Sequence, residues 1–91
     1  MEATKVYISV VAAFLEDGTI EPKSLTWTNG REYAIKKVLG MRPAAAEKCG
    51  GQGDRYTVQM ANGDIRYLFF EHNPKRYQAP LGRWFVEKIT Q

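Results

Sequence analysis

The chain has 91 residues, of which 44% are hydrophobic and 25% are charged, as is typical of one small globular domain. Its single cysteine excludes an internal disulfide, and its apolar runs are far shorter than the roughly 20 residues of a membrane helix. We therefore expect one domain spanning residues 1–91, with no membrane segment. The first residues do not resemble a secretory signal, which predicts a cytoplasmic protein.

The charge of the chain is unevenly distributed. Residues 1–30 hold two lysines and four acidic residues, a net charge of −2, whereas residues 31–91 hold eleven lysines and arginines and six acidic residues, a net charge of +5. A surface with an excess of positive charge attracts anionic partners such as nucleic acid. The larger part of the chain is therefore suited to such a partner, although its charge does not require one.

Three turn signals divide the chain into predicted strands. The pairs Asp17-Gly18, Asn29-Gly30 and Asn62-Gly63 each stand between apolar or β-branched runs, as in tight hairpins. We expect six strands, at about residues 5–15, 19–28, 32–41, 55–60, 65–71 and 83–89.

The segment 29–40, "NGREYAIKKVLG", fits either a strand or a helix. In a helix, Asn29 would be the N-cap, Glu32 would complete a capping box and Gly40 would end the helix. In a strand, a three-residue loop at 28–30 would oppose Leu25 to Tyr33, with Gly30 in the left-handed position of a bulged turn. We favour the strand because its neighbours are strands.

Two segments between the predicted strands have no strand pattern. Residues 42–51, "RPAAAEKCGG", predict at most one short helical turn, which would begin at Pro43 and end at Gly50. The glycine-rich stretch 49–54, "CGGQGD", predicts a connecting loop, and it lacks the Gly-Lys-Ser/Thr sequence of a phosphate-binding loop.

The register of the hairpin around Asn62-Gly63 decides which side chains share a face. A two-residue loop predicts the opposed pairs Met60–Ile65, Val58–Tyr67 and Tyr56–Phe69, all on one apolar face. The other face then holds the pairs Arg55–Phe70, Thr57–Leu68 and Gln59–Arg66.

These elements predict an all-β fold, either a small, strongly bent six-stranded antiparallel sheet or an SH3-like barrel. The layout "Trp27…Gly30…Tyr33-x-Ile35-x-x-Val38", followed by "Arg55-Tyr-Thr-Val58" and "Arg83-Trp-Phe-Val86", resembles that of small bacterial SH3-like β-barrel domains of unassigned function. The resemblance spans most of the chain. It implies a fold and no activity.

The sequence does not favour catalysis. Cys49 and His72 are the only available thiol and imidazole, and a nucleophile and its base also need a third group that orients the base. The neighbours of His72 in a strand point away from it, so they are poorly placed for that role. We expect no enzyme activity, no cofactor and no metal site.

The predicted second face of the 55–71 hairpin raises a functional question. Leu68 and Phe70 would lie there beside Arg55 and Arg66, either covered as a second part of the core or exposed as a binding face. Nearby basic and aromatic residues would extend an exposed face: Lys75, Arg76, Tyr77, Arg83 and Trp84.

We therefore expect a small nucleic-acid-binding β-barrel, in which aromatic side chains stack on the bases of a single strand and cations contact its phosphates. The alternative is a protein-interaction module or homo-oligomer without catalysis, using a strand edge or the Leu68/Phe70 patch.

Overall fold

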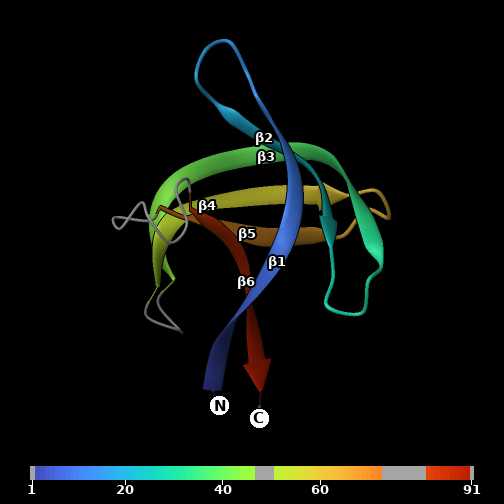
Figure 1. The fold of residues 1–91 in the computed structure, drawn as a ribbon, viewed down its shortest axis with the longest axis vertical. Helices are drawn as coiled ribbons and strands as arrows, with labels where there is room; N and C mark the ends of the chain where they lie inside the picture. The colour runs from blue at the N-terminus through green and yellow to red at the C-terminus, as the bar shows by residue number, and fades with distance from the viewer. Residues whose placement is uncertain (1, 47–50, 73–81, 91) are drawn as a thin grey trace.

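The computed structural model describes residues 2–46, 51–72 and 82–90, and these form only strands and turns. Six antiparallel strands follow one another around a closed barrel in chain order, and the last strand pairs with the first (Figure 1). They are β1 (Glu2–Phe14), β2 (Ile20–Thr26), β3 (Glu32–Ala46), β4 (Gly51–Met60), β5 (Ile65–Glu71) and β6 (Arg83–Thr90). The all-β, six-stranded antiparallel barrel predicted from the sequence is confirmed.

Two long strands close the barrel by changing neighbours. In β1, residues 2–8 pair with β6 and residues 9–14 pair with β2. In β3, residues 32–34 pair with β2 and residues 35–46 pair with β4, across two irregularities that bend the strand. The far part of the β1–β2 hairpin consequently extends beyond the body of the barrel, whereas both chain ends lie together on the opposite side (Figure 1).

The strand interpretation of residues 32–39 is confirmed, but the helical turn expected after Arg42 is wrong as far as Ala46, because β3 continues to that residue. Pro43 lies opposite Asp54 in β4. A proline has no N–H to donate to a neighbouring strand. At this point β3 pairs with β4 only, so the N–H groups on its other side have no strand to bind and a proline is tolerated. Gly51–Asp54 likewise belong to β4 and not to a loop.

All three short turns have the same hydrogen-bond pattern. In the β2–β3 turn, the Gly30 N–H donates to the Trp27 carbonyl at 2.9 Å, and the Trp27 N–H donates to the Arg31 carbonyl at 2.8 Å. The Asn29 side-chain oxygen accepts the Arg31 N–H at 3.0 Å. Equivalent bonds form in the β1–β2 and β4–β5 turns, and the glycine of each turn has a φ between 85° and 94°. These are three-residue loops that end in a left-handed glycine.

The three-residue loop predicted at 28–30 is thus confirmed, and the two-residue loop predicted at Asn62-Gly63 is wrong. Tyr56 opposes Leu68 and Arg55 opposes Phe69, a shift of one residue from the predicted register. Because side chains alternate along a strand, a shift of one residue reverses the two faces of β5 relative to β4. Leu68 and Phe70 therefore face the interior.

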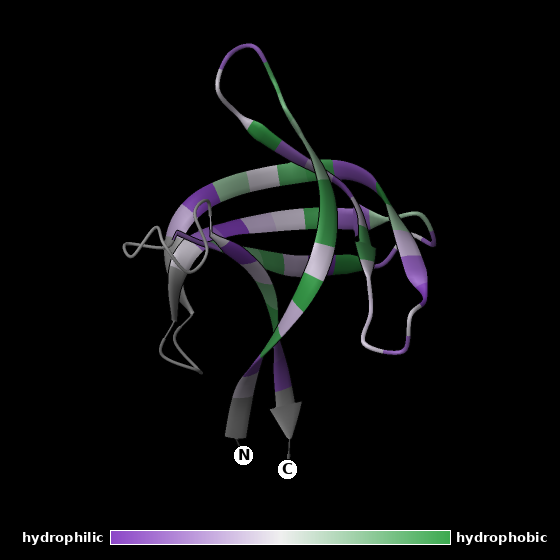
Figure 2. Cartoon of the chain, in the orientation of Figure 1, coloured by the Kyte–Doolittle hydropathy of each residue, from purple (hydrophilic) through white to green (hydrophobic). Residues whose placement is uncertain are grey.

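The interior of the barrel is filled mainly from β4 and β5. Its buried members are Leu25, Ile35, Tyr56, Val58, Met60, Leu68 and Phe70. Burial of a large side chain of this kind contributes about 1.5–3 kcal/mol to stability. Figure 2 shows hydrophobic and hydrophilic residues alternating along the lower part of β1, as expected for a strand with one face on this core.

One glycine of β4 lies against the backbone of β5. A Cβ at Gly53 would be 2.4 Å from the carbonyl oxygen of Phe70 and 2.9 Å from its carbonyl carbon, so the backbone would have to move to accept it. We expect Gly53→Ala to lower the free energy of unfolding by about 2 kcal/mol or more, as measured by urea denaturation.

The matched control is Gly40→Ala in β3, where a Cβ would meet nothing within 4 Å. It should leave the stability unchanged or raise it slightly, because alanine restricts the unfolded chain. Equal effects of the two substitutions would contradict the close approach at Gly53.

Candidate functional site

A row of aromatic and cationic residues crosses the outer face of the barrel. Successive register partners on β3, β4, β5, β6 and β1 place Arg42, Arg55, Phe69, Phe85 and Tyr7 side by side. Neighbouring strands lie about 4.8 Å apart, so the row extends over about 19 Å. We call these five residues the aromatic–cation row.

The centre of the row is a pair of stacked phenylalanines. The rings of Phe69 and Phe85 are nearly parallel, with centroids 5.0 Å apart, and both residues are buried although they lie outside the barrel wall. Tyr7 meets Phe85 edge to face at 5.9 Å, and the Lys5 ammonium lies 5.1 Å from the Phe85 ring centroid. The phenylalanines thus form an apolar floor beneath more polar side chains.

An arginine–tyrosine contact lies on each side of this floor. The Arg83 guanidinium carbon lies 3.9 Å from the Tyr7 ring centroid, and the Arg55 guanidinium carbon lies 4.7 Å from that of Tyr67. Tyr67 is 52% exposed and Tyr7 is 39% exposed, so each ring keeps surface available to a ligand. Arginine over an aromatic face is a favourable cation–π geometry.

Arg55 and Arg83 differ in their charge neighbours. The Arg83 guanidinium also lies 3.4 Å from a carboxylate oxygen of Glu71. None of the ion pairs among the described residues involves Arg55, and its buried Nε has no hydrogen-bond partner. Among the described residues, no carboxylate therefore forms an ion pair with the positive charge on the Tyr67 side of the row.

Glu71 connects the cations on the Tyr7 side. It accepts hydrogen bonds from the Lys5 ammonium at 2.7 Å and from the Tyr7 hydroxyl at 3.1 Å. Partial burial would raise the pKa of Glu71, but these hydrogen bonds and the charges of Lys5 and Arg83 outweigh burial and hold its pKa below the usual value. The hydrogen bond to Glu71 is also the main reason that the pKa of Lys5 is raised.

The predicted site residues separate into three groups. Leu68 and Phe70 are in the core, which answers the question of whether they form a second part of it. Trp84 packs against Tyr56 and Phe70 on the inner side of β6. Leu68, Phe70 and Trp84 therefore do not form an exposed binding patch.

The remaining predicted residues are charged or lie outside the described part of the chain. Arg55 and Arg83 are on the outer face, Arg55 in the row itself. Arg66 is exposed near the end of the β4–β5 hairpin and pairs with Asp64 at 3.1 Å. Lys75, Arg76 and Tyr77 lie outside the described residues.

Of the pair considered for catalysis, the structure describes only His72. His72 contacts Asp54 at 3.0 Å and meets Phe70 edge to face, whereas Cys49 lies outside the described residues. Within 2–46, 51–72 and 82–90, no three metal-ligating side chains of the His, Cys, Asp and Glu types form a group.

Sequence reasoning missed most of the outer face. The residues that it did not select are Lys5, Tyr7, Arg42, Tyr67, Phe69, Glu71 and Phe85. A signal was available, because "TNGR" at 28–31 and "ANGD" at 61–64 share the Asn-Gly pair. The three-residue loop chosen for the first, if applied to the second, would have turned Tyr67 and Phe69 outward.

The comparisons with known proteins found no relative: no family model, curated protein or solved structure matches this chain. The part of the chain that the structure describes has no helix with the length and apolar character of a membrane span. The function of the outer face must therefore be argued from its own geometry.

The ion pairs of Glu71 predict an acid-sensitive stability. The pKa of Glu71 is lower in the folded protein than its ordinary value of 4.5, so the stabilisation is complete above that pH and is lost as the pH falls through the folded pKa. We expect the free energy of unfolding, measured in urea between about pH 3 and pH 8, to decrease at the acid end, and Glu71→Gln to reduce this dependence.

The control is Glu32→Gln, which removes an exposed carboxylate at the start of β3 and should leave the loss of stability at low pH nearly unchanged. If the free energy of unfolding falls at low pH as steeply in Glu71→Gln as in the parent protein, the Glu71 carboxylate is not stabilised as described.

Proposed function

We propose that the outer face of β4, β5, β6 and β1 binds single-stranded nucleic acid. The observation that carries this proposal is the aromatic–cation row together with its two arginine–tyrosine contacts: Arg83 lies over Tyr7 and Arg55 lies over Tyr67, on either side of the buried phenylalanine floor, and both tyrosines are partly exposed. Unpaired bases stack on aromatic rings while neighbouring cations contact the phosphates.

The individual side chains suit different parts of such a ligand. Tyr67 is the more exposed ring, and we assign it the first base. Arg55 and Arg42 lie next to each other in the register and have no carboxylate partner among the described residues, so we assign them the phosphates. Lys5 and Arg83 share Glu71, and their main task is to hold the Tyr7 side of the surface.

A single strand fits this surface better than a duplex. Stacking requires bases that are not already stacked in a helix, and the face offers rings and guanidinium groups without an element that could enter a groove. Because every base has a π-face, binding of this type is tolerant of sequence and sensitive to salt.

The proposal predicts the effect of removing one ring. Tyr67→Leu should weaken the binding of a labelled single-stranded oligonucleotide of about 10 nucleotides by roughly 5- to 150-fold, the range that corresponds to the loss of one stacked base. The measurement is fluorescence anisotropy at low ionic strength, and the matched control is Tyr33→Leu, which removes a 40% exposed tyrosine of β3.

The proposal also predicts the effect of removing one cation. Arg55→Gln should reduce the slope of log K against log salt concentration by about 0.7, the value for one phosphate contact to a single strand. Arg31→Gln, in the β2–β3 turn, is the control and should not change the slope. No binding at low salt, or equal weakening by Tyr33→Leu and Tyr67→Leu, would refute the proposal.

A further inference from the structure

The far half of β1 has an unpaired backbone edge. β6 and β2 lie on opposite sides of β1 in the barrel order, and β6 pairs only with residues 2–8. Among the described residues, no strand therefore pairs with the β6-side edge of residues 9–14. An open edge presents free N–H and C=O groups and accepts another strand in an extended conformation.

This edge lacks the features that usually prevent strand pairing. Residues 9–14 read "SVVAAF", with no charge and no proline, and the irregularity in the β1–β2 ladder adds its extra residue, Lys23, on β2. Val11 and Phe14 are each 65% exposed. Figure 2 shows this upper part of β1 as a continuous hydrophobic stretch below a hydrophilic tip.

The other open edges of the described strands carry charges, which β1 lacks at residues 9–14: residues 2–8 of β1, 65–68 of β5 and 86–90 of β6 each include at least one charged residue. The edges of β2 and β3 are protected further. The free edge of β2 carries Glu21, Pro22 and Lys23, of which Lys23 is ion-paired with Glu21. The free edge of β3 carries lysines, Pro43 and two irregularities. Charges, proline and bulges are the devices by which proteins block edge-to-edge association. The contrast singles out β1 as an edge left available for pairing.

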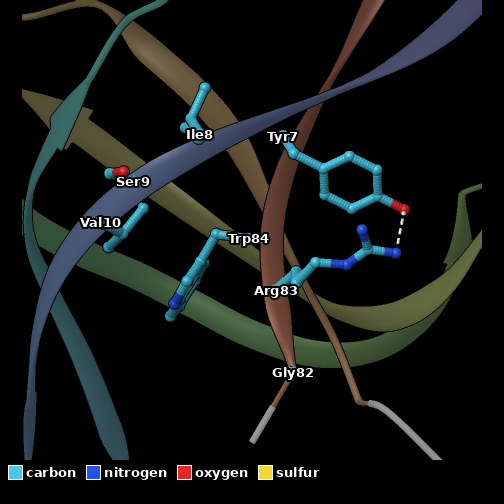
Figure 3. Close-up of a pocket in the computed structure, with 7 residues that line it drawn as sticks. All are labelled: Tyr7, Ile8, Ser9, Val10, Gly82, Arg83 and Trp84. Carbon is cyan, nitrogen blue, oxygen red and sulfur yellow. Dashed lines mark hydrogen bonds between the residues drawn. The ribbon is translucent and has the colours of Figure 1, made fainter. Parts of the chain in front are cut away.

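A shallow groove lies at the base of the same edge. It has a volume of about 440 Å³ and is lined by Tyr7, Ile8, Ser9, Val10, Gly82, Arg83 and Trp84, at the point where β6 begins and β1 continues alone. Figure 3 shows the Arg83 side chain beside Tyr7, on the side of β6 opposite to Trp84. Arg83 thus lies at the end of the open edge, and because it shares the single carboxylate of Glu71 with Lys5, this group of side chains keeps a net positive charge.

We propose that residues 9–13 of β1 pair, antiparallel, with the same residues of a second copy of this chain. Because directly opposed residues share a face of a sheet, the two-fold axis must pass through one residue position, and we place it at Val11. Ser9 then opposes the partner's Ala13, and the two exposed Val11 side chains cover each other. The strand order across the interface is β2, β1, the partner's β1 and the partner's β2.

Charge complementarity favours a second copy over an unrelated strand. In this register the chain of one copy runs past Phe14 toward the start of the partner's β6. The β1–β2 turn of that copy, with Glu16 and Asp17, then approaches the partner's Arg83. The two-fold axis makes this contact twice, and the uncharged central edge brings no like charges together.

The test places a positive charge at Val11 in one variant and a negative charge in another, and measures dimerisation of each variant alone and of their mixture. Sedimentation equilibrium of the nuclease-treated protein, across the micromolar to millimolar range, should show a monomer–dimer equilibrium. Val11→Lys and Val11→Glu should each weaken dimerisation by about tenfold or more, because each replaces an apolar pair with two like charges. An equimolar mixture of the two variants should restore the dimer.

Leu39→Lys in β3, at another half-exposed apolar residue, is the control and should dimerise like the parent protein. A second measurement is oxidation of Val11→Cys in a Cys49→Ser background, where the two Cα atoms would be about 4.5–5.5 Å apart, within disulfide range. A monomeric parent protein, Val11 variants that dimerise normally, or a mixture that stays monomeric would overturn the proposal. A dimer that forms only before nuclease treatment would instead be bridged by nucleic acid.

Discussion

A glycine in the left-handed region ends each of the three short turns, and the one at Gly63 decides which side chains of β4 and β5 face the core. With φ near 94°, Gly63 allows the three-residue loop that places Met60 opposite Asp64. The rest of the hairpin follows: Leu68 enters the barrel and Phe69 leaves it. A change of one residue in the loop would exchange these roles, so both the core and the outer surface depend on this turn.

The outer face is in turn organised by Glu71. Its carboxylate is held by side chains from β1 and β6, the two strands whose pairing closes the barrel. The same contacts leave the Tyr7 ring beneath Arg83. On the other side of the phenylalanine floor, no carboxylate among the described residues forms an ion pair with Arg55, and this asymmetry leaves positive charge available next to Tyr67.

Much of the fold could be predicted because its signals are local. Turn pairs and alternating apolar residues gave the number and approximate position of the strands, and β5 matches the prediction at both ends. The length of the loop at Gly63 could not be decided in the same way. Both registers bring an apolar set to one face, since β5 carries large apolar residues on its two sides: Tyr67 and Phe69 on one, Leu68 and Phe70 on the other.

The outer site was less predictable, for a physical reason. Arg55 and Arg83 could be selected for their charge, but Phe69 and Phe85 become a site only when β6 is placed beside β5 and β1 beside β6. Those pairings join segments that are distant in the sequence, and residue types alone do not determine which strands become neighbours. The continuation of β3 through Pro43 could not be predicted for a similar reason. A strand tolerates a proline there because β3 has no neighbour on its other side, and the sequence does not show which side of a strand is unpaired.

The closure of the barrel by β1 and β6 has a consequence for folding. Arg83 and Tyr7 are 76 residues apart in the sequence, whereas each of the three turns joins adjacent strands through three residues. Local hairpins form quickly, and contacts between distant segments form slowly because a long loop must first be ordered. Until its two ends meet, the chain is an open sheet with both edges of its first strand accessible along much of their length. Intramolecular closure must then be faster than exchange of that strand between chains.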